Sequence, residues 1–115
     1  MLPPTMRTWP QPKRNFVRRG ELRGYTRPSS PDLSRTVVLL SSDGINESTR
    51  PWLLGIELRD RDPGDILAIP VGEQRWAYAG DLTRLYRAWI GDRVGTLGTT
   101  ALSRLDGALR AALDL

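Results

Sequence analysis

Short apolar runs separated by turn-forming residues recur along the first 80 residues, and this feature constrains the fold most. The breaks between the runs hold proline, glycine, serine and aspartate, as in Asp43-Gly44 and Asp62-Pro63-Gly64, which favour turns. Five short strands at turn-rich spacing predict a small β-barrel or a curled sheet. The five runs are Glu21 to Tyr25, Thr36 to Leu40, Trp52 to Leu58, Ile66 to Val71 and Trp76 to Ala79.

The run from Thr36 to Leu40 is continuously apolar and begins with β-branched side chains. A strand that is buried on both faces has this composition, whereas apolar and polar residues alternate along a strand with one solvent-exposed face. We therefore expect this run to be the central strand.

After residue 80 the apolar spacing becomes helical. One set of side chains at i, i+3, i+4 and i+7 predicts a short helix ended by Gly91: Leu82, Leu85, Tyr86 and Trp89. Residues 93 to 97 predict one more strand. A leucine and alanine stripe from Leu102 to Leu113 predicts a C-terminal amphipathic helix capped by Thr99 or Thr100. The expected fold class is mainly β (α+β), a small barrel with a short helix and a C-terminal helix.

The length of 115 residues fits one domain with one small core. Residues 1 to 16 hold four prolines among polar residues, so we expect a flexible basic leader followed by a single domain over 17 to 115. Residues 1 to 20 carry five basic side chains and no acid, whereas the whole chain carries a net charge of +4. The remainder is close to neutral, so net charge alone is weak evidence for a nucleic-acid partner.

Histidine and cysteine are both absent from the sequence. Their absence excludes disulfide scaffolds, zinc fingers, cysteine enzymes and Ser-His-Asp hydrolases. Any catalysis must rest on arginine, carboxylate, hydroxyl and backbone groups, and we expect no metal and no cofactor. No apolar run has the length of a signal peptide core or a membrane span, so we expect a cytoplasmic protein without membrane contact.

Three stretches in order resemble the MazF/PemK family of bacterial toxin ribonucleases. Arg19-Gly20-Glu21-Leu22 resembles the family's Arg-Gly-acid-aliphatic opening, and residues 35 to 43 resemble its Arg-Pro-Val-Val-Val-Val-Ser stretch. Residues 93 to 113 are similar to its Ile-Gly-Arg-Leu strand and final helix. The resemblance covers residues 18 to 115. It implies an SH3-like β-barrel, a homodimer, metal-independent cleavage of single-stranded RNA and inhibition by a cognate antitoxin peptide.

The same resemblance implies a catalytic role for Arg35, which matches the position of the family's catalytic arginine. Thr36 replaces the usual proline, and Glu57-Leu58-Arg59 falls where the family has a Pro-hydrophobic-Thr element, so the usual catalytic hydroxyl is missing. Gly80-Asp81-Leu82 likewise lacks the family's glutamine. Either the site is rebuilt around Arg35, Arg59 and an acid such as Glu57 or Asp81, or activity is reduced or lost.

A polar turn after the central strand lies, in this family, beside the RNA groove, although Asx turns explain the same composition. From this turn Ser41, Ser42 and Asn46 are candidates for RNA binding, and Arg19 and Asp81 are two further candidates. Aromatic residues could also stack on unpaired bases, although at strand and helix periods they are more often core or interface residues. These aromatic residues are Trp52, Trp76, Tyr78 and Trp89.

Two classes of function remain open. The first is a toxin endoribonuclease in which Arg35 stabilises the transition state, with Arg59 as a second phosphate contact and Glu57 as a candidate base. The second is a binding module on the same barrel, either a catalytically degenerate toxin or a relative of the gyrase-poisoning toxins, that acts through a protein partner. The missing threonine favours the second class, and Arg35 favours the first.

Overall fold

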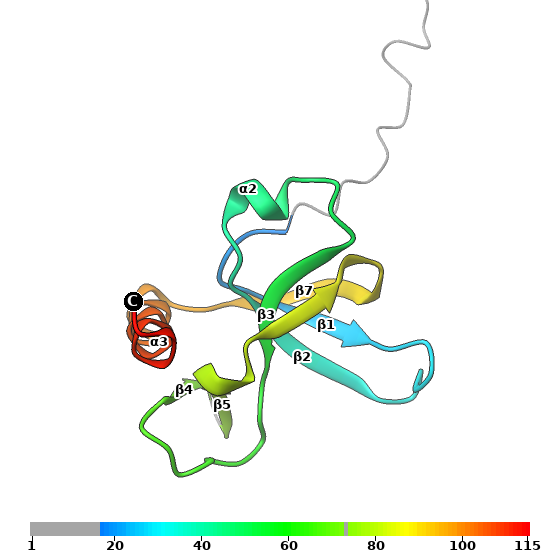
Figure 1. Cartoon of the computed structure of the whole chain (residues 1–115). Coiled ribbons are helices and arrows are strands. Elements are labelled where there is room, and N and C mark those ends of the chain that lie inside the picture. Colours follow the sequence, from blue (N-terminus) through cyan, green and yellow to red (C-terminus); the bar gives the residue numbers. More distant parts are fainter. Residues whose placement is uncertain (1–16, 73) are drawn as a thin grey trace, which may run out of the picture.

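A five-stranded antiparallel sheet forms the centre of the computed structural model, which describes residues 17–72 and 74–115 (Figure 1). The strand order is β6-β3-β2-β1-β7. The expected leader over residues 1 to 16 lies outside the described residues. The strands are β1 (Glu21–Thr26), β2 (Ser34–Leu39), β3 (Trp52–Glu57), β6 (Thr83–Tyr86) and β7 (Ile90–Thr96).

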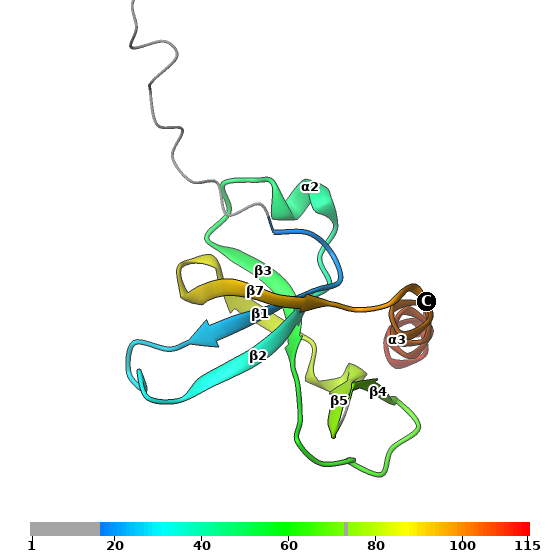
Figure 2. The same cartoon turned by 180° about the vertical axis from the view of Figure 1, so that it is seen from behind.

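A hairpin and a helix pack against this sheet. The hairpin consists of β4 (Ala68–Gly72) and β5 (Arg75–Tyr78), and the helix is α3 (Thr99–Leu113). Figure 1 and Figure 2 both show α3 beside the β4–β5 hairpin, on one side of the sheet. The mainly β class with a C-terminal helix is therefore confirmed. Among the described residues, no helix is both long enough and apolar enough to cross a membrane.

The run that was expected to be central is β2, which lies between β1 and β3. Val37, Val38 and Leu39 are fully buried. Val38 belongs to the apolar cluster on one face of the sheet, whereas Val37 and Leu39 belong to the cluster on the other face. Burial on both faces explains why this strand lacks the usual alternation of apolar and polar residues.

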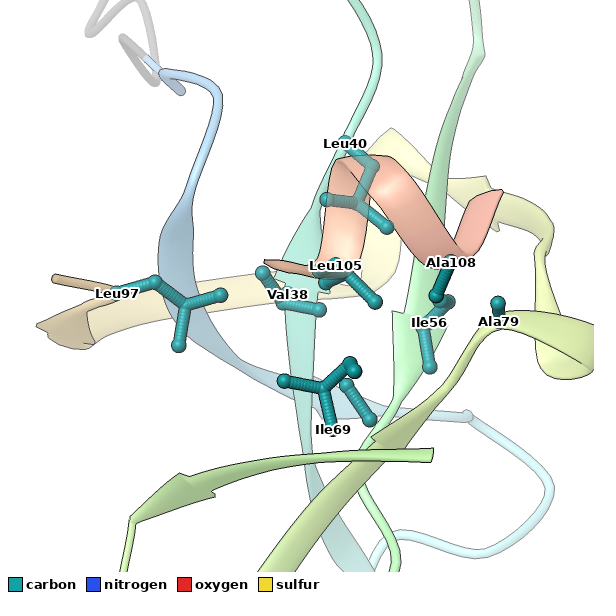
Figure 3. Packing of buried hydrophobic residues seen from close by; sticks show 9 residues of the cluster. Val38, Leu40, Ile56, Ile69, Ala79, Leu97, Leu105 and Ala108 are labelled. Atoms are coloured by element: carbon teal, nitrogen blue, oxygen red, sulfur yellow. The ribbon is translucent and has the colours of Figure 1, made fainter. Parts of the chain in front are cut away.

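The first cluster fills the space between the sheet, α3 and the β4–β5 hairpin (Figure 3). Val38 and Ile56 from the sheet, Ile69 from β4 and Leu105 from α3 meet there. The second cluster, on the opposite face, includes Tyr25, and the Tyr25 hydroxyl accepts a hydrogen bond from the Tyr86 backbone N–H at 3.0 Å.

Helix α3 begins one residue earlier than a threonine cap requires. Gly98 is the N-cap and no side chain bonds to the exposed N–H groups, so the prediction of a Thr99 or Thr100 cap is wrong. Leu105 and Ala108 are buried, whereas Leu113 is 54% exposed. The leucine and alanine stripe of α3 therefore packs on the sheet only over the first three turns of the helix.

The predicted helix over residues 82 to 89 is also wrong. This segment is a strand, β6, between two short 3₁₀ turns, η1 (Ala79–Asp81) and η2 (Arg87–Trp89). Strand β6 pairs with β3, and Leu85 opposite Leu53 is buried while Tyr86 is 48% exposed. A four-residue strand between two turns placed apolar residues at helical spacing by coincidence. Gly91 lies inside β7 rather than at a helix end.

Candidate active site

Four of the residues predicted from sequence meet in one groove. Arg35, Glu57, Arg59 and Asp81 all line a cavity of about 600 Å³ at the end of β3. The remaining lining residues are Leu58, Asp60, Arg61, Asp62, Pro63 and Thr83. The segment after β3, with its alternating charges, therefore forms one wall of the groove.

Strand register brings Arg35 to Glu57. Glu57 is the last residue of β3 and pairs with Val37 of β2, and Arg35 lies two residues before Val37 on the same face of the sheet. Diagonal neighbours of this kind are within reach of long side chains. Arg35 Nη1 lies 2.8 Å from Glu57 Oε1, and Arg27 Nη2 lies 3.8 Å from the other carboxylate oxygen.

Arg59 is fixed through both its backbone and its side chain. Its N–H and C=O form an isolated antiparallel bridge with Trp76 of β5, at 2.8 and 2.9 Å. Its guanidinium donates two hydrogen bonds to Asp81, from Nε at 2.7 Å and from Nη2 at 2.9 Å. This bidentate pair raises the pKa of Arg59 above its already high ordinary value, so the guanidinium is charged at neutral pH.

The Arg59 guanidinium also stacks on an aromatic ring, with its central carbon 5.1 Å from the Tyr78 ring centre. The Tyr78 hydroxyl lies 3.3 Å from Asp65 Oδ2. The negative charge of Asp65 and this hydrogen bond raise the pKa of Tyr78 above its ordinary value. Tyr78 therefore stays a neutral hydroxyl at neutral pH.

The turn predicted at Asp62-Pro63-Gly64 is confirmed and shapes the groove wall. Asp62 Oδ1 accepts a hydrogen bond from the Gly64 N–H at 2.8 Å, and Gly64 has φ +70°. A side chain is disfavoured in this left-handed conformation, which explains the glycine.

Charges in the groove nearly balance. Three arginines line it, including Arg61, against four carboxylates, including Asp60 and Asp62. A smaller cavity of about 300 Å³ shares Arg35, Leu58 and Asp60 with the groove and adds Arg75. Any anion that enters must compete with carboxylates for Arg35 and Arg59.

Most of the residues proposed to bind RNA lie outside this groove. Arg19 donates through both terminal nitrogens to the Asp106 carboxylate of α3, and its Nε donates to the Leu40 carbonyl at 3.1 Å. Arg19 thereby ties α3 to the sheet. Of the five candidates for RNA binding, only Asp81 lines the groove.

The polar turn after β2 is a short helix, α2 (Asp43–Asn46), instead of an Asx turn. Ser42 caps it, accepting a hydrogen bond from the Ile45 N–H at 3.4 Å. Ser41 and Asn46 are buried, and the Ser41 hydroxyl donates to Asn46 Oδ1 at 2.5 Å. These two side chains satisfy one another inside the fold, so their observed contacts are structural.

Sequence reasoning missed Thr83, which lines the groove and offers a hydroxyl. It is the first residue of β6 and pairs with Gly55 of β3. The helical spacing after residue 80 concealed this position, because it assigned the segment to a helix rather than to a strand next to Glu57.

No family model matches the sequence, and no curated protein matches it. Solved structures do match its fold. An endoribonuclease of a mycobacterial species, in complex with its cognate antitoxin, superposes with a TM-score of 0.74 at 16% identity, over 86% of this chain and 96% of that one. MazF in a MazE–MazF complex from Deinococcus radiodurans gives a TM-score of 0.73 at 16% identity, over 87% and 98%.

The Mycobacterium tuberculosis toxin MazF-mt6 gives a TM-score of 0.70 at 15% identity, over 83% of this chain and 97% of that one. Coverage of nearly the whole of each neighbour shows that the likeness extends over one complete domain of that type. The chain therefore has the fold of the MazF endoribonuclease toxins, as its sequence motifs predicted.

Proposed function

We propose that this protein is the toxin of a toxin–antitoxin pair and that it cleaves single-stranded RNA without a metal ion. The observation that carries the proposal is the Arg35–Glu57 pair, with 2.8 Å between Nη1 and Oε1, inside a groove of a MazF-like fold. An arginine beside a carboxylate supplies the two groups that cleavage by the ribose 2′-hydroxyl needs, and neither group is a histidine.

In the proposed reaction the 2′-oxygen attacks the adjacent phosphorus and loses its proton to the Glu57 carboxylate. The bond from phosphorus to the 5′-oxygen breaks, the 5′-oxygen takes a proton from water, and a 2′,3′-cyclic phosphate remains. Arg35 binds the phosphoryl oxygens, whose negative charge increases in the transition state. A planar guanidinium provides two parallel donors for this purpose.

Arg59 provides the second phosphate contact in this proposal. Its backbone bridge to Trp76 and its stacking on Tyr78 hold the guanidinium in the groove before substrate binds. Asp81 accepts from Nε and Nη2, which uses two of the five guanidinium N–H groups, so the remaining N–H groups are the ones that would contact the phosphate. Thr83 offers a hydroxyl on the same wall.

The proposed partners are single-stranded RNA, a cognate antitoxin peptide and a second copy of this chain. Neighbours of the same fold have been solved with their antitoxins, which supports the antitoxin. Several large apolar side chains are exposed, including Val94 at 63% and Leu113 at 54%, which supports a homodimer. Light scattering that shows a monomer at about tens of micromolar contradicts the dimer. Because the proposed substrate is RNA, the proposed site of action is the cytoplasm.

One observation favours the alternative, a binding module that acts through a protein partner. Two of the three arginines of the groove, Arg35 and Arg59, already have carboxylate partners, and the lining charges nearly cancel. A polyanion gains little long-range attraction from such a surface. A protein partner with charges of both signs fits it equally well.

Incubation of the purified protein with mixed-sequence RNA in EDTA separates the two functions. The nuclease proposal predicts discrete cuts whose upstream fragments end in a cyclic phosphate. The matched control is the Arg35→Ala/Glu57→Gln protein, which lacks both proposed groups and is purified by the same route. Intact RNA with the wild-type protein, together with retained toxicity in cells, supports the binding module instead.

A further inference from the structure

A tryptophan flanked by two arginines lies at the opposite end of β3 from the groove. Trp52 begins β3, and the Arg84 and Arg50 guanidinium carbons lie 4.8 and 5.6 Å from its ring centre. Glu57 ends the same strand, about 17 Å away at roughly 3.3 Å per residue. In Figure 1, β3 runs from the α2 end of the molecule toward the β4–β5 hairpin, so the two sites are at different ends.

These two arginines differ from those of the groove. Among residues 17–72 and 74–115, no carboxylate lies within 4.0 Å of the Arg50 or Arg84 side-chain nitrogens, whereas Arg35 and Arg59 each contact one. Both side chains are exposed. Stacking on an indole orders a guanidinium while leaving its N–H groups free to bind an anion.

The local structure holds this arrangement in place. Arg87 donates to the backbone carbonyls of Arg50, Asn46 and Ile45 at 2.9, 2.9 and 3.3 Å, which fixes the approach to β3. These acceptors are neutral, so Arg87 adds a third positive charge. Tyr86, opposite Trp52 on β6, is 48% exposed and contacts Trp89, with ring centres 4.7 Å apart.

We propose that Arg50, Trp52, Arg84 and Tyr86, here called the Trp52 platform, bind single-stranded nucleic acid outside the groove. Aromatic rings beside unpaired arginines are the combination that recognises bases by stacking and the backbone by charge. The proposal rests on the proposed function for its natural ligand, a stretch of the RNA substrate beyond the cleaved bond.

Strand β6 connects the two sites. It is an edge strand, and its consecutive residues Thr83 and Arg84 point to opposite faces of the sheet, the first toward the groove. An RNA strand that leaves the groove reaches the platform by crossing this edge. The paired charges of the groove attract RNA weakly, so the platform supplies the unopposed positive charge.

The test uses a fluorescently labelled oligodeoxythymidine of about 12 nucleotides, which stacks and carries phosphates but has no 2′-hydroxyl to be cleaved. Its dissociation constant is measured by anisotropy at several salt concentrations. The platform variant is Arg50→Ala/Arg84→Ala, and the matched control is Arg104→Ala/Arg110→Ala, which removes the same charge from exposed positions of α3.

We expect the platform variant to bind about tenfold more weakly and to lose about 1.4 from the salt slope, at roughly 0.7 for each phosphate contact. The α3 variant should bind like wild type. Trp52→Leu should weaken binding with both arginines present, and circular dichroism checks that each variant is folded. Wild-type protein that does not bind the probe, or equal binding by the two double variants, overturns the proposal.

Sedimentation of the same proteins tests whether the Trp52 platform is instead an interface between two copies of the chain. A platform variant that changes from dimer to monomer identifies this surface as an interface between copies and also overturns the proposal. Because the probe cannot be cleaved, a wild-type protein without ribonuclease activity that still shows the selective loss refutes the proposed function and supports the platform.

Discussion

The Arg35 guanidinium forms an ion pair with the Glu57 carboxylate across two neighbouring strands, with 2.8 Å between Nη1 and Oε1. Both side chains are partly exposed, at 51% and 27%, so neither is a buried structural charge. An exposed ion pair of this kind contributes about 0 to 1 kcal/mol to stability. Removing either side chain should therefore change the stability of the fold little.

Glu57→Gln should separate RNA binding from cleavage. The amide cannot accept the proton of the 2′-hydroxyl, so we expect kcat to fall about 100-fold or more. The same change removes the negative charge beside Arg35, so we expect KM to fall as well. Steady-state kinetics on a short RNA measure both constants, and a rise in KM with unchanged kcat would show that Glu57 serves only to position the substrate.

Asp81→Asn should release the Arg59 guanidinium for phosphate. Losing one carboxylate shifts the charge of the groove lining by one positive unit, so single-stranded RNA should bind more tightly at low salt and less so at high salt. Weaker RNA binding by Asp81→Asn would contradict competition between Asp81 and phosphate for Arg59.

Arg59→Ala is the complementary change. The cleavage rate of this variant should fall modestly if Arg59 only positions the RNA backbone, and by about 100-fold if Arg59 replaces the family's hydroxyl.

The Tyr78 hydroxyl should titrate above its usual range because Asp65 lies beside it. The pKa of Tyr78 is raised in the folded protein, so this contact stabilises the fold below the ordinary tyrosine pKa and the contribution is lost as pH rises through the higher folded value. Asp65→Asn should move one tyrosine transition, followed by ultraviolet absorbance, down toward about 10. The same transition in Tyr78→Phe should disappear. An unshifted titration in Asp65→Asn rules out the contact.

Two glycines should respond to alanine in opposite ways. A Cβ at Gly55 would lie 2.4 Å from the Val38 carbonyl oxygen and 2.5 Å from Leu85 Cδ1, so Gly55→Ala should destabilise the sheet by about 3 kcal/mol or more. Gly107 is inside α3 with no atom within 4 Å of a new Cβ, so Gly107→Ala should stabilise by about 1 kcal/mol. Thermal unfolding measures both changes. A Gly55→Ala protein that melts at the wild-type temperature would show that small movements of the neighbouring atoms relieve the close approach at Gly55.

The strands before residue 80 could be predicted because turn signals separate the apolar runs, and the structure uses some of these signals, such as Asp62 with Gly64. The central position of β2 followed from a single property, burial on both faces. By contrast, residues 82 to 89 misled the prediction, because Leu85 pairs with Leu53 of a strand that lies 32 positions earlier in the chain. Local spacing carries no information about that partner.

The site was predictable where it follows the strands and not where it follows side-chain contacts. Arg35, Glu57, Arg59 and Asp81 were expected to act together, and they line one groove. The pairing of Arg59 with Asp81 depends on η1, which local sequence did not reveal. Arg19 was a candidate for RNA binding, yet its guanidinium is paired with the carboxylate of Asp106, 87 positions later in the chain.

Cleavage of a mixed-sequence RNA in EDTA by the wild type, Arg35→Ala, Arg35→Lys and an Arg104→Ala control tests the central claim most directly. The account predicts that Arg35→Ala keeps the wild-type melting temperature and cleaves about 100 to 1,000 times more slowly, because one preorganised donor to the transition state is lost. Arg35→Lys should recover little of the rate, since an ammonium cannot form the bidentate contact, and Arg104→Ala should cleave like wild type. Undiminished cleavage by folded Arg35→Ala would contradict the account.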